Sequence, residues 1–108
     1  MSPTALYVAQ RGTAAILLPL VLGHVALILY AVGDGLSAGE ILARTRGSTF
    51  WGLYYGLFVV AAAVHAAIGV RSVLGDWTRL SRTALDRVAL GFGLLLLLLG
   101  SRALVGIL

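Results

Sequence analysis

A histidine lies deep within an apolar stretch of this 108-residue chain. Between Phe58 and Gly69, every residue other than His65 is apolar. A titratable side chain at membrane depth is costly, and it usually faces a partner, a cavity or a cofactor rather than lipid. Three kinds of chemistry are open to this imidazole: a hydrogen bond to a neighbouring helix, ligation of haem iron, and transfer of a proton or an ion.

The helical neighbours of His65 are mostly small near the ring. Positions three, four, seven and eleven residues away share its helix face, and they are Tyr54, Phe58, Ala61, Ala62, Ile68, Gly69, Ser72 and Asp76. Small residues leave room for a flat, bulky group beside the imidazole. They equally suit close packing of two membrane helices, so the face alone does not decide between these alternatives.

A haem b site needs axial imidazoles, and cations near the membrane surface for its propionates. Arg11 and Arg71 stand near one predicted boundary, although arginines there also serve topology and snorkelling. His24 lies thirteen residues after Arg11, or about 20 Å along a helix, which predicts a depth close to that of His65. For His24, packing, ligation of a second haem and ligation of the same haem all remain open.

The elements that position these residues are three membrane helices. With 60% hydrophobic and 11% charged residues, the chain is predicted to be an all-α membrane protein. One domain over residues 1–108 is expected to form a three-transmembrane-helix bundle, with spans at about 12–33, 49–74 and 88–108. A short interfacial helix is expected to end near Gly47, with Ser48 and Thr49 as the candidate caps of the second span. Thr83 and Asp86 resemble a capping box before the third span.

The charge distribution predicts the topology. Arg11 and four arginines around the second connection oppose two in the first connection, so the N-terminus is expected to be cytoplasmic. Arginines spread over both ends of the spans indicate topology rather than nucleic-acid binding. The chain has no cysteine, so it cannot hold an iron–sulfur cluster by itself. Two rival functions remain: a small transporter or channel subunit with a histidine-lined pathway, and a haem-free structural anchor.

Three segments resemble the membrane-anchor subunits of succinate dehydrogenase and fumarate reductase, closest to the small hydrophobic type. They run from Gln10 to Thr13, from Ser37 to Glu40, and from His65 to Trp77. The resemblance implies a complex in the inner membrane, where this multi-pass anchor joins a second membrane anchor, an iron–sulfur subunit and a flavoprotein. FAD and the iron–sulfur clusters would belong to the partners, which would oxidise succinate, while quinone would accept the electrons near the anchors.

The same resemblance implies roles for individual residues. His65 would be an axial ligand of haem b, shared with a histidine of the other anchor, and Arg11 would lie near the propionates. Asp76 and Trp77 match the Asp-Tyr pair of the family's quinone site, although tryptophan lacks the acceptor of a phenol. His24 would suit a version with two haems. The remaining residues assigned to the haem pocket are Gly69, Arg71 and Ser72.

Overall fold

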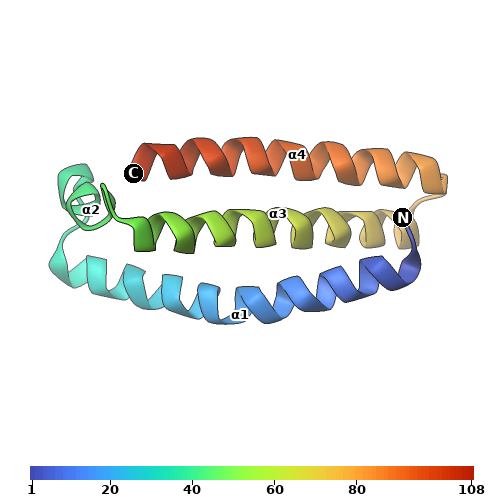
Figure 1. Cartoon of the computed structure of the whole chain (residues 1–108). Helices are drawn as coiled ribbons and strands as arrows, with labels where there is room; N and C mark the ends of the chain where they lie inside the picture. The colour runs from blue at the N-terminus through green and yellow to red at the C-terminus, as the bar shows by residue number, and fades with distance from the viewer.

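A computed structural model describes all 108 residues as four helices (Figure 1). They are α1 (Pro3–Asp34), α2 (Ala38–Thr45), α3 (Thr49–Trp77) and α4 (Arg82–Ile107). The three long helices run side by side, with α3 between α1 and α4, and α2 lies across one end of the bundle. The molecule measures 49 × 23 × 23 Å, long enough to cross the roughly 40–45 Å of a bilayer with its headgroups.

Every helix begins at a serine. In each case the serine hydroxyl accepts a hydrogen bond from the backbone N–H three residues later, which satisfies a donor that the first turn leaves free. The N-caps are Ser2, Ser37, Ser48 and Ser81. The cap predicted at Ser48 is therefore confirmed. The turns that end α1 and α2 use Gly35 and Gly47 at positive φ, 142° and 73°, where a residue with a Cβ would be strained.

The long helices extend beyond the predicted apolar spans. Helix α1 begins at Pro3 rather than near residue 12, and α4 begins at Arg82 rather than near residue 88. The capping box expected from Thr83 and Asp86 is wrong, because the cap is Ser81 and the Asp86 carboxylate binds Arg71 instead. These starts fall outside the spans because Gln10 and Arg11 interrupt the apolar pattern of α1 and because the first turn of α4 is polar. Hydropathy marks the part of a helix that meets lipid and not the whole helix.

Small residues let α3 and α4 approach closely. Ala63 and Ala89 are buried between the helices, and a Cβ at Gly93 would lie 3.2 Å from the Cβ of Ala67. Only 6 of the 108 residues are buried, so nearly all of the apolar surface points outward. Long helices that are apolar all round are suited to lipid or to neighbouring membrane helices. The predicted all-α architecture with three membrane-spanning helices is confirmed.

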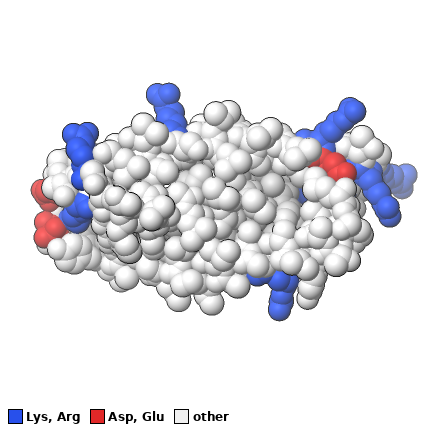
Figure 2. Space-filling model, viewed as in Figure 1, with Lys and Arg blue, Asp and Glu red and all other residues white.

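Charged side chains gather at the two ends of the bundle, and the surface between them is largely apolar with isolated basic residues (Figure 2). At one end, the Arg44 guanidinium donates to the Asp34 carboxylate at 2.6 Å and to the Gly35 carbonyl at 2.9 Å. At the same end, the Thr45 hydroxyl donates to the carbonyl of Ile107 at 2.7 Å. These bonds hold α2, the expected interfacial helix, against the ends of α1 and α4.

Candidate functional site

His65 lies at the interface of α3 with α1. Its Nδ1 is 3.1 Å from the Thr13 hydroxyl oxygen, so the ring faces α1 rather than α4. The contact places Thr13 at the same depth as His65. Because α1 begins well before the predicted span, Thr13 lies ten residues inside the helix rather than at its start.

The second nitrogen of His65 is free. Nε2 makes no hydrogen bond within the chain, and it is not among the enclosed polar atoms that lack a partner. A free imidazole nitrogen in an apolar setting is what ligation of haem iron requires. No three His, Cys, Asp or Glu side chains come together anywhere in the chain. The available donor set is therefore one histidine, which fits an axial ligand shared with another subunit better than a metal ion held by this chain.

A recess lies between α1 and α3, toward the N-terminal end of α1, and His65 is not among the residues that line it. It has a volume of about 320 Å³ and is lined in part by Gln10 and Ser72. The Gln10 Oε1 is buried without a hydrogen-bond partner, which is costly unless a ligand, a subunit or water supplies a donor. A Cβ at Gly69 would lie 3.7 Å from the Gln10 Nε2. The structure thus brings Gly69 and Ser72 together with Gln10, for which no role was predicted.

The two arginines assigned to propionate binding point to different surroundings. Arg11 is exposed, lies 6.0 Å from the centre of the Tyr7 ring, and has no acidic partner in this chain. Its Cα lies about 3 Å along the helix from that of Thr13, near the depth of His65, but a separation of two residues turns Arg11 about 200° around α1, away from the face of Thr13. The Arg71 Nε donates instead to the Asp86 carboxylate at 2.8 Å. Of the two, Arg11 is the cation without an acidic partner in this chain, and Arg71 is already paired.

His24 lies at a different depth from His65. Its Nδ1 is 3.4 Å from the Tyr55 hydroxyl oxygen, and its ring meets Phe58 edge-on with a 5.6 Å centroid separation. Tyr55 and Phe58 precede His65 by seven to ten residues, which is about 10–15 Å along α3. The equal depth expected from the sequence is therefore not found. The two histidines are too far apart along the bundle to bind opposite sides of one iron.

Asp76 and Trp77 form the exposed end of α3. Trp77 is 84% exposed, and Asp76 makes no ion pair or side-chain hydrogen bond within the chain. Asp76 follows His65 by eleven residues, or about 16 Å along the helix. Asp76 therefore lies on the helix face of His65 but about three turns away, at the bundle end, where it is free to contact a partner or a ligand.

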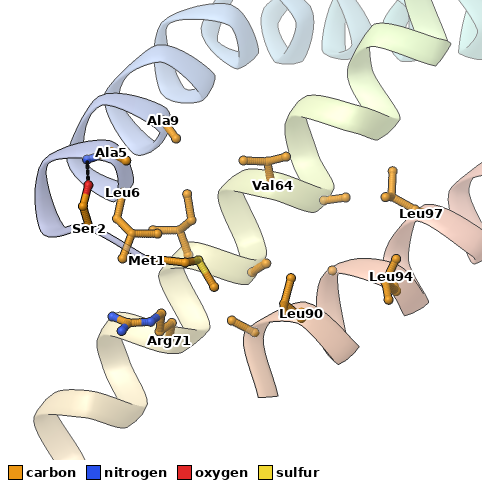
Figure 3. A pocket seen from close by; sticks show the side chains of 15 residues that line it. Met1, Ser2, Ala5, Leu6, Ala9, Val64, Arg71, Leu90, Leu94 and Leu97 are labelled. Atoms are coloured by element: carbon orange, nitrogen blue, oxygen red, sulfur yellow. Dashed lines mark hydrogen bonds between the residues drawn. The ribbon is translucent and has the colours of Figure 1, made fainter. Parts of the chain in front are cut away.

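A groove lies between α1 and α4, with α3 as its floor (Figure 3). Its volume is about 450 Å³, and small or aliphatic residues such as Ala9, Val64 and Leu94 line most of it, with Arg71 near one end. It contains no histidine. The groove is suited to hydrocarbon chains or an apolar helix, and the candidate haem ligand lies outside it.

Three long apolar helices and a short helix across one end define a small multi-pass membrane protein that carries a histidine with a free nitrogen at membrane depth. The family model described as succinate dehydrogenase/fumarate reductase transmembrane subunit matches residues 1–100. The chain therefore belongs to that family, and this membership implies a complex with other subunits of such an enzyme. Neither the curated proteins nor the solved structures contain a match to the chain. The resemblance seen in the sequence is confirmed at the level of the family.

Proposed function

We propose that this chain is a haem b-binding anchor of a succinate:quinone oxidoreductase, with His65 as one axial ligand. The single observation that carries the proposal is the free Nε2 of His65 at membrane depth, on a ring whose Nδ1 is already held by Thr13. Bound haem b would supply one-electron redox chemistry within the membrane. A histidine of a second membrane anchor would provide the other axial ligand, because His24 lies too far along the bundle.

The residues around His65 suit the remaining parts of a haem. Gly69 adds no side chain beside the recess, and the Ser72 hydroxyl and Gln10 amide supply donors there. The unpaired Arg11 guanidinium offers charge-assisted bonds to a propionate. We assign Arg71 a smaller part in the same pocket, because its Nε is engaged with Asp86. His24, beside a cavity of about 190 Å³, stays a candidate ligand of a second haem.

The end of the bundle that carries Asp76 is proposed to face the cytoplasm and the catalytic partners. Five of the eight arginines belong to the N-terminal segment and the second connection, against two in the first connection. An iron–sulfur subunit, with the flavoprotein beyond it, would dock there. Asp76 and Trp77 would help form the quinone site, where the carboxylate can pass protons to a reduced quinone and the indole N–H can donate a hydrogen bond. The whole chain would act as one anchor domain without succinate chemistry of its own.

Reduced-minus-oxidised absorbance of the purified complex tests the proposal. We expect a b-type band in the wild type, a lost or strongly reduced band in His65→Ala, and a retained band in His24→Ala, the matched control at the other membrane histidine. A pyridine haemochrome assay would count the haems in each variant. A wild-type complex without a b-type band would refute haem binding. A normal band in His65→Ala would refute the ligand assignment.

A further inference from the structure

The Thr13 hydroxyl makes three close contacts. Its oxygen lies 2.8 Å from the Ala9 carbonyl, 3.1 Å from the Gln10 carbonyl and 3.1 Å from the His65 Nδ1. A hydroxyl has one proton to donate and two lone pairs that accept. Since a carbonyl oxygen can only accept, the proton of Thr13 is directed at the backbone of its own helix.

This arrangement determines which ring nitrogen of His65 carries the hydrogen. With its proton on a carbonyl, the Thr13 oxygen presents a lone pair to the His65 Nδ1, so Nδ1 must carry the hydrogen. In a neutral imidazole the other nitrogen is then unprotonated. The opposite tautomer would need the hydroxyl to turn its proton from the carbonyls to Nδ1, and it would leave the Nε2 hydrogen without an acceptor in this chain, which is costly in an apolar region.

We infer that Thr13 is a positioning residue that holds His65 as the Nδ1–H tautomer and aims its Nε2 lone pair at the iron. The inference rests on the proposed haem ligation. It adds a residue on another helix that selects the ligating form of the ring before haem binds. Histidine ligands commonly donate their second N–H to a nearby acceptor, and loss of that acceptor typically costs about 10–100-fold in metal affinity.

The hydrogen bond also bears on the redox behaviour of the haem. An acceptor on Nδ1–H makes the imidazole a stronger electron donor, which stabilises ferric over ferrous iron and lowers the reduction potential. Removal of the acceptor is therefore expected to raise the potential and to speed haem loss. A purely structural contact between α1 and α3 would change the potential no more than any other packing change.

The test compares Thr13→Val with Thr13→Ser in the purified complex. Valine keeps the shape and removes the acceptor, whereas serine keeps the hydroxyl, and Thr4→Val at an exposed site of α1 is the matched control. We expect Thr13→Val to raise the potential and to lose haem to excess apomyoglobin about tenfold faster or more. Thr13→Ser and Thr4→Val should behave as the wild type.

A second measurement separates this inference from the haem proposal. Side-chain ¹⁵N shifts of His65, with only this subunit labelled, should show a protonated Nδ1 and an unprotonated Nε2, and Thr13→Val should remove that preference. If the complex holds no haem but the shifts follow this pattern, ligation fails and the tautomer selection stands. If haem is present and Thr13→Val leaves the potential, the haem loss and the shifts unchanged, the inference is overturned.

Discussion

The contact between Gly100 of α4 and Val59 of α3 gives a direct test of how the bundle packs. A Cβ built at Gly100 would lie 2.5 Å from the Val59 Cγ1 and 3.0 Å from its Cγ2. Carbon atoms in favourable contact are about 3.5–4.0 Å apart. Gly100→Ala therefore forces the two helices apart or drives the valine out of its rotamer.

The size of the effect follows from two opposing terms. Extra volume in a packed interface costs about 1–3 kcal/mol, while alanine in a helix gains about 0.5–1 kcal/mol over glycine. Gly91→Ala is the matched control, because nothing lies within 4 Å of a Cβ at that position. Both variants share the propensity gain, so the difference between them isolates the overpacking cost of about 1–3 kcal/mol.

The assay is unfolding of the chain in mixed micelles by titration with a denaturing detergent, followed through tryptophan fluorescence. Gly100→Ala should unfold at a lower detergent fraction than Gly91→Ala. Adding Val59→Ala to Gly100→Ala should recover most of the lost stability, because this second substitution removes the two methyl groups in closest contact. Equal stability of Gly100→Ala and Gly91→Ala would contradict the close α3–α4 packing described here.

Three further perturbations follow from the structure. Tyr54→Phe removes the hydroxyl that donates to the Leu20 carbonyl at 2.5 Å and should lower the unfolding free energy by about 1 kcal/mol in the same titration. Thr45→Val removes the bond to the end of α4, so amide hydrogen exchange in α2 should become faster. Arg11→Met should speed haem loss more than Arg71→Met does, because only the first removes a cation without an acidic partner; equal rates would contradict that ranking.

The sequence was sufficient for the number of membrane helices, because each leaves a long apolar signature that no packing detail can hide. Ser48 also marked the start of α3 correctly, since a serine followed by an aromatic and apolar run is a strong local signal. The starts of α1 and α4 were placed too late. Gln10 and Arg11 separate the apolar residues 5–9 from the long apolar run of α1, and the first turn of α4 is polar, so neither start belongs to a continuous apolar pattern.

The error at α1 had a consequence for the site. A span that starts near residue 12 places Arg11 and Thr13 at the membrane boundary. Gln10 then has no predicted contact and belongs only to a sequence motif. Once α1 begins at Pro3, antiparallel packing sets Thr13 beside His65 and Gln10 beside Gly69. One sequence signal could have predicted these contacts. Gln10 and Thr13 are one turn apart on one face of a mostly apolar helix, which indicates a face that contacts another helix.

The predicted depth of His24 was wrong for a related reason, because the sequence does not show how α1 and α3 are aligned along their lengths. Counting residues from an assumed boundary gave both histidines one depth, whereas the contacts of His24 with Tyr55 and Phe58 fix it nearer the opposite end. A single chain's sequence does not state how two helices slide against each other. That offset depends on side-chain packing, here including the entry of the Tyr54 hydroxyl beside Gly23.

The most direct test of the account is a cryo-EM map of the intact complex that resolves the ligands of the haem iron. We predict electron-rich density of a haem between this chain and a second membrane anchor, with the iron bonded to the Nε2 of His65 and the Thr13 hydroxyl against Nδ1. A haem whose two axial ligands both come from other subunits, or a complex with no haem beside His65, would contradict it.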